Sequence, residues 1–113
     1  MNILRELNSL LDSLGVNVET GVFSDTVPEE YAVITPLADT YDLFSDNSPE
    51  FETQEARLSL YFKGNYLKQK NRILKALLDA DFTITDRQYI AHEDDTGYHH
   101  YAIDTAKIYP IEE

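Results

Sequence analysis

The chain has 113 residues, of which 42% are hydrophobic and 27% charged, a composition typical of a single folded domain. It contains no cysteine, which excludes a disulfide scaffold, thiol catalysis and a cysteine-ligated zinc site. The net charge of −12 is uneven, because residues 1–56 hold twelve acids and one base whereas residues 57–113 hold nine acids and eight bases.

The first third of the chain predicts a helix followed by two short strands. Apolar residues recur every three or four positions over residues 2–14, the pattern of an amphipathic helix that Asn2 can cap and Gly15 can end. Residues 16–23 alternate in part between valine and other side chains, and residues 31–36 form an apolar run that ends at a proline. We expect a short strand in each of these two segments.

Residues 38–55 have a different character. They hold six acids and no base, together with Ser, Asn and Pro residues that favour turns. We expect a long acidic loop at about 38–55, poorly ordered in the free subunit, because this composition cannot offset the entropy cost of folding alone. Long loops in small domains are usually functional or disordered. Four apolar side chains lie among the acids: Tyr41, Leu43, Phe44 and Phe51. They favour a loop that docks on a partner over a loop that folds back on its own domain.

The second half of the chain predicts a strand, a helix and a β-hairpin. Residues 57–63 alternate between apolar and polar side chains, as in a half-buried strand. Residues 66–80 have the apolar spacing of a second amphipathic helix. Residues 82–91 and 98–109 are strand-like and flank a turn in which Gly97 supplies a positive φ. The polar face of the helix is basic, with Lys68, Lys70, Arg72 and Lys75.

These elements run in the order α-β-β-β-α-β-β. Because the strands come in blocks rather than alternating with helices, we expect an α+β fold in which two helices pack on a mostly antiparallel sheet. No repeat or low-complexity tract divides the chain, so we expect residues 1–113 to form one domain.

The histidines near the predicted turn are the strongest candidates for chemistry. His92, His99 and His100 lie close to three acids, a set that suits a divalent metal. His99 and His100 are neighbours on a strand, however, so their side chains point to opposite faces and leave two ligands and a mobile carboxylate. We expect cross-strand pairing of these side chains and no metal site.

Motifs of known enzyme classes are absent from the sequence. It has no G-x-S-x-G nucleophile elbow, no G-x-x-x-x-G-K-[ST] phosphate loop, no G-x-G-x-x-G and no EF-hand spacing. A flexible acidic loop offers no pocket that would shift the pKa of a catalytic carboxylate. We therefore expect no enzymatic activity, no catalytic residue and no cofactor.

The basic helix face favours a protein contact over a nucleic-acid contact. Four bases on one helix are weak evidence for nucleic-acid binding in a chain that is otherwise acidic and repels phosphates. The more economical interpretation is a subunit interface, in which the acidic loop of one copy meets Lys68, Arg72 and Lys75 of the next. A head-to-tail contact of this kind closes into a ring when the rotation between copies allows.

Five segments, in this order and spacing, resemble a known family. They are the leucine-rich helix ending at 14–16 (LGV), then 31–34 (YAVI), the acidic stretch before 57–64 (RLSLYFKG), 73–78 (ILKALL) leading into 81–82 (DF), and 95–103 (DTGYHHYAI). The chain resembles, over almost its whole length, the tail completion proteins of phages and prophages with long non-contractile tails. These are also called tail terminator or head–tail joining proteins.

The resemblance implies a structural virion protein. Its α+β subunit would assemble as a six-fold ring at the top of the tail tube, stop tail polymerisation and present a surface to the head connector. The implied partners are further copies of the chain, the tail tube protein and the head connector protein, with DNA only as cargo passing through the ring and with no membrane contact. The implied localisation is the virion, and the host cytoplasm during assembly. The resemblance has no catalytic residues to transfer.

A second hypothesis comes from the charge alone. Small acidic proteins without cysteine also include inhibitors that mimic nucleic acid and regulate a DNA-binding protein. Neighbouring genes separate the two hypotheses, because capsid, portal and tail genes favour the phage interpretation and a restriction or repair operon favours the mimic. A metal-dependent enzyme built on the hairpin histidines ranks last.

Overall fold

The structure, a computed structural model, describes residues 2–19, 29–45 and 48–111. Its elements are α1 (Ile3–Ser13), β1 (Asn17–Val18), β2 (Glu30–Ser45), β3 (Ser48–Phe62), α2 (Tyr66–Asp79), β4 (Thr83–His92) and β5 (His99–Pro110). The sheet order is β1-β2-β3-β5-β4, with β1 parallel to β2 and the other neighbours antiparallel. The prediction of an α+β fold, with two helices on a mostly antiparallel sheet and elements in the order α-β-β-β-α-β-β, is confirmed.

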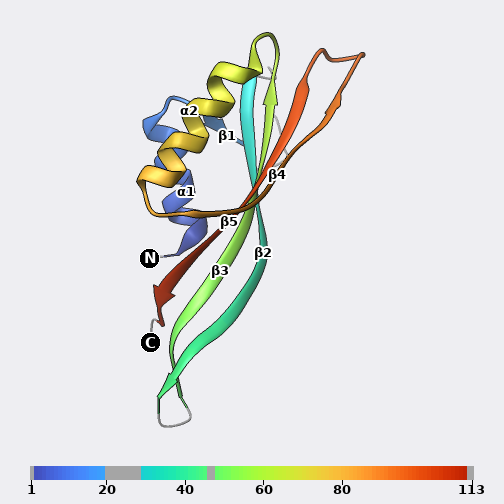
Figure 1. The fold of residues 1–113 in the computed structure, drawn as a ribbon. Helices are drawn as coiled ribbons and strands as arrows, with labels where there is room; N and C mark the ends of the chain where they lie inside the picture. The colour runs from blue at the N-terminus through green and yellow to red at the C-terminus, as the bar shows by residue number, and fades with distance from the viewer. Residues whose placement is uncertain (1, 20–28, 46–47, 112–113) are drawn as a thin grey trace.

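Both helices pack on one face of the sheet, so the body of the protein has two layers (Figure 1). The apolar stripe of α1 turns inward and buries Leu7 and Leu11 completely, and α2 buries Ile73 and Leu77 in the same way. Beneath the helices lie alternate residues of the two central strands: Leu58, Leu60, Phe62 and Ile103. Removal of these side chains from water is the main source of stability for the body.

The helix ends follow the sequence signals. The Oδ1 atom of Asn2 accepts a hydrogen bond from the backbone N–H of Arg5 at 2.9 Å, so Asn2 caps α1 as predicted. Gly15 follows the helix with φ of 76°, the left-handed conformation in which glycine is unstrained. Neither of the two helices in the described residues is long and apolar enough to span a membrane.

The structure of the acidic segment differs from the prediction. Residues 38–55 were expected to form a loop, but β2 continues to Ser45 and β3 begins at Ser48, and the two strands pair antiparallel over this whole length. The physical reason is that Thr40, Tyr41 and Thr53 are good strand formers, and that Asp39 and Glu50 stay exposed to water when the two strands pair. We call the paired residues 38–45 and 48–55 the arm.

Pro36 does not end its strand, contrary to the prediction. A β-bulge lies between Pro36 and Ala38, and β2 has no strand beside its outer edge beyond Ala32 among the described residues. Proline is tolerated at such a bulge on an edge strand because no partner strand there requires its missing N–H. The strand predicted at residues 16–23 is found only at Asn17–Val18, and its later part lies outside the described residues.

The arm projects beyond the two-layer body (Figure 1). β5 accompanies β3 as far as the pair Phe51 and Pro110, and the N–H of Ile111 donates to the carbonyl oxygen of Glu50 at 3.2 Å, so the arm beyond Glu50 is a two-stranded ribbon. The molecule is 55 Å long and at most 27 Å across. Figure 1 shows the arm at one end of the long axis, and the start of α2 with the loop before it at the other.

Candidate self-association surfaces

One face of the arm presents acids around an exposed tyrosine. Tyr41 pairs across the ribbon with Glu52, and Asp39 pairs with Gln54. Alternation along β3 places Glu50 on this same face. The Tyr41 side chain is 60% exposed, the largest exposure among the large hydrophobic residues of the described chain. We call Asp39, Tyr41, Glu50 and Glu52 the acidic face.

Gln54 anchors the acidic face to the body. Its Oε1 atom accepts a hydrogen bond from the backbone N–H of Ile3 at 2.8 Å, and its Nε2 donates to the Oε1 of Glu52 at 2.8 Å. Gln54 is buried, so this amide links the first turn of α1 to the base of the arm. Glu52 is therefore held in place, whereas Asp39 and Glu50 are exposed to solvent.

The four apolar residues predicted as an interface do not form one patch that the structure describes. Tyr41 lies on the acidic face. Phe51 is half-buried on the opposite face of the ribbon, where it pairs with Asp42 and Pro110. Leu43 and Phe44 belong to β2, but their side chains lie outside the described part of the structure.

The predicted basic helix face divides into two parts. Lys68 and Arg72 line a hollow of about 460 Å³, together with Glu30, Lys63, Asn65 and Gln69. We call this the basic hollow. Lys75 follows Arg72 by three residues on the same side of α2 but does not line the hollow, and it forms an exposed ion pair with Asp79 at 3.1 Å. Of the three predicted residues, the structure therefore brings Lys68 and Arg72 together in one hollow and leaves Lys75 outside its lining, and their joint role at an interface stays a prediction.

A short chain of hydrogen bonds organises the basic hollow. Arg72 donates from its NH1 to the Oε1 of Gln69 at 3.1 Å, and Gln69 donates from its Nε2 to the Oε2 of Glu30 at 3.0 Å. The Nζ of Lys63 lies 4.8 Å from the ring centroid of Tyr98, within cation–π distance. Arg72 thus uses one N–H within the hollow, and its other guanidinium N–H groups form no hydrogen bond among the described residues.

The histidines form cross-strand pairs of aromatic rings. His92 and His99 face each other across the β4–β5 hairpin with ring centroids 4.6 Å apart. The Nδ1 of His99 shares a hydrogen bond with the Tyr89 hydroxyl at 2.8 Å, and the Nδ1 of His92 lies 3.2 Å from Asp94. No group of three or more metal-binding side chains occurs among the described residues.

His100 lies on the opposite face of the sheet, as alternation requires. It stacks on Tyr61 at 4.3 Å between ring centroids, and Tyr61 stacks on Tyr31 at 4.6 Å, so three rings cross three adjacent strands. Burial lowers the pKa of His100 below its usual value and raises the pKa of Tyr31 to about 12. Next to this stack, Arg57 donates to both carboxylate oxygens of Asp104, at 2.7 and 3.1 Å.

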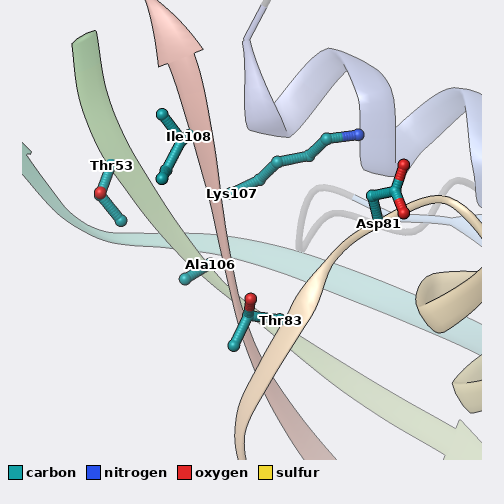
Figure 2. Close-up of a pocket in the computed structure, with 6 residues that line it drawn as sticks. All are labelled: Thr53, Asp81, Thr83, Ala106, Lys107 and Ile108. Atoms are coloured by element: carbon teal, nitrogen blue, oxygen red, sulfur yellow. The ribbon is translucent and has the colours of Figure 1, made fainter.

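A second hollow lies where β4 begins beside β5 (Figure 2). Its one base, Lys107, is already bound, because its Nζ donates to Glu6 at 2.6 Å and to the carbonyl oxygen of Ala80 at 2.8 Å. This lysine joins α1 to the end of α2, which is a structural role. The lining is Thr53, Asp81, Thr83, Ala106, Lys107 and Ile108.

Sequence reasoning found Lys68 and Arg72 but missed Lys63 and Glu30. Glu30 is the first residue of β2 and Lys63 follows the last residue of β3, and the pairing of Glu30 with Phe62 brings them together. No protein-family model matches the chain, and no curated protein matches it.

Proposed function

We propose that the chain is a tail completion (tail terminator) subunit of a long-tailed phage or prophage. Copies of it assemble into a ring that caps the tail tube, stops its growth and joins it to the head connector. Its partners are then further copies of itself in a six-fold ring, the tail tube protein and the head connector protein. The protein acts in the host cytoplasm during assembly and in the virion afterwards.

The observation that carries this proposal is the arm. A ribbon of this length extends the molecule to 55 Å and presents Tyr41 to solvent, and its end lies beyond both helices (Figure 1). Exposed aromatic side chains on projecting elements are characteristic of protein contacts. An element that projects from one end and binds elsewhere on the next copy makes a heterologous contact, the kind from which rings are built.

The charge supports a ring through which DNA passes. A net charge of −12 disfavours binding to phosphates, so DNA can move past such a protein without being held. The basic side chains are too few and too scattered to form a continuous track: Arg57 and Lys107 are paired within the fold, and Lys75 is paired on the helix surface.

Deletion of the gene from the phage or prophage that encodes it tests the role. Electron microscopy of lysates should show abnormally long tail tubes or tails without heads, and expression of the wild-type chain should restore normal virions. A phage that is unrelated in its tail proteins is the matched control and should be unaffected. Normal virions from the deletion would contradict the proposal.

A further inference from the structure

Within the described residues, the basic hollow holds more bases than acids. Lys63, Lys68 and Arg72 surround it with one acid, Glu30, whose carboxylate already accepts a hydrogen bond from Gln69. None of the three bases forms an ion pair within the described ranges of the chain. Three bases against one acid are unusual in a chain of net charge −12, and they attract an anionic partner.

The acidic face of the same chain carries complementary charge, but it lies too far from the basic hollow to contact it within one subunit. Glu50 precedes Lys63 by thirteen residues along extended backbone, which separates them by about 40 Å at the usual rise per strand residue. Figure 1 shows the two regions at opposite ends of the molecule. A subunit therefore cannot place its acidic face in its own basic hollow.

We propose that the basic hollow of one copy binds the acidic face of the arm of a second copy. Lys68 and Arg72 pair with Asp39 and Glu50 of the other copy, and Tyr41 packs between the charges. The exposed ring provides most of the binding and the charges set the register, since exposed ion pairs contribute little individually. The inference rests on the proposed self-assembly but does not depend on the tail tube or the head connector.

A second copy fits this hollow better than nucleic acid does. The first half of the chain supplies abundant carboxylates at high local concentration in any assembly. A nucleic acid would bring many phosphates close to the acids of the whole surface, where each one beyond the hollow is repelled. The contact between unlike ends is heterologous, so each copy uses both its arm and its hollow.

A charge exchange between two variants tests the pairing. The first variant, Asp39→Lys with Glu50→Lys, has two bases against one acid, Glu52, on the former acidic face, and a basic hollow. The second, Lys68→Glu with Arg72→Glu, has an acidic arm and an acidic hollow. Analytical ultracentrifugation and native mass spectrometry in low salt should show self-association of each variant weakened by at least about tenfold, whereas an equal mixture should associate as wild type does, with the two variants alternating.

A matched control has the same total charge as the second variant. Lys75→Glu with Arg87→Glu makes the same change in net charge as the second variant, at exposed positions outside the hollow. It should associate as wild type does. Equal weakening by this control, or a mixture of the two charge-exchanged variants that stays monomeric, would overturn the proposal.

Zero-length cross-linking gives a readout that does not require a long-lived complex. A carbodiimide joins a lysine amine to a carboxylate in contact, so wild-type protein should yield peptides that link Lys68 or Lys63 to Glu50 or Asp39. Such a link must be intermolecular because of the distance within one copy. Its absence in concentrated wild-type protein, or capture of a DNA oligonucleotide that depends on Lys68 and Arg72, would reject the contact. Normal virions from a gene deletion would reject the tail role and leave these results unchanged.

Discussion

The two ends of strand β3 have the same backbone conformation but differ in burial and in what covers them. Leu58 and Leu60 lie under the helices with no exposed surface, whereas Glu50, ten residues before Leu60, is exposed at the point where the chain after β5 leaves the arm. The backbone hydrogen bonds with β2 are continuous through both parts. Pairing of strands alone therefore does not make a core, and the helices decide which part of the hairpin stabilises the fold and which part is available to a partner.

The largest expected effect is in the body. Leu60→Ala should lower the free energy of unfolding by about 2–5 kcal/mol, because it removes a completely buried side chain between the sheet and the helices. Urea denaturation followed by circular dichroism measures this loss. A change below about 1 kcal/mol would mean that the site collapses around the smaller residue or that the helices pack more loosely than described.

Urea denaturation of an arm variant provides the comparison with the body. Tyr41→Ser should change the free energy of unfolding by no more than about 0.5 kcal/mol, because the ring is mostly exposed. In the phage it should prevent the formation of sealed tails, and Phe44→Ser is expected to do the same. Electron microscopy of tails is the readout, with Tyr41→Phe as the conservative control. If both serine variants gave normal virions, the arm would not be the contact, and the free strand edges or the β4–β5 hairpin would become the candidates.

Alkaline pH should destabilise the body through its buried tyrosines. The pKa of Tyr31 is raised to about 12 by burial, and burial together with Glu6 also raises the pKa of Tyr109. Above pH 10 these tyrosines ionise in the unfolded chain before they ionise in the folded one, so stability is present below pH 10 and is lost as the pH rises toward the folded-state pKa. Tyr31→Phe should flatten the decline measured by urea denaturation between pH 9 and 11. An unchanged decline would show that Tyr31 is not responsible.

A smaller effect is expected at acid pH from His100. Burial lowers the pKa of His100 from 6.5, with Glu93 opposing the shift and Arg57 adding to it. As the pH falls below 6.5 the unfolded chain binds the proton first, so the folded state loses stability. His100→Gln should reduce the dependence of unfolding free energy on pH between 7 and 5. A His100→Gln profile that matched wild type would remove His100 as the cause.

Local sequence patterns predicted the parts of the fold that are buried on one side. The three-to-four spacing of Leu7 and Leu11 and the alternation of Leu58 and Leu60 each identify an element by its apolar face. The same reasoning did not predict the arm, because exposed acids such as Asp39 and Glu50 occupy positions where a half-buried strand has apolar side chains. A ribbon of this kind has the composition of a loop, and its strands are recognised only when the two segments that pair are considered together.

The candidate site was predictable only where it is local. Lys68 and Arg72 are four residues apart on one helix, so their proximity follows from the helical repeat. Lys63 and Glu30 join them through the register between β2 and β3, which no single segment encodes. Lys75 instead pairs with Asp79, and the helical spacing alone does not predict which neighbour Lys75 contacts.

Hydrogen exchange of the arm tests most directly whether it is an assembly element. The two-stranded end of the arm has no helix above it, so its backbone amides should exchange fast in the free subunit and much more slowly in assembled tails, while the amides of Leu58 and Leu60 are protected in both. Mass spectrometry of peptides from residues 42–50, at that two-stranded end, gives the comparison. Full protection of these peptides in a verified monomer, or no gain in protection on assembly, would contradict the account.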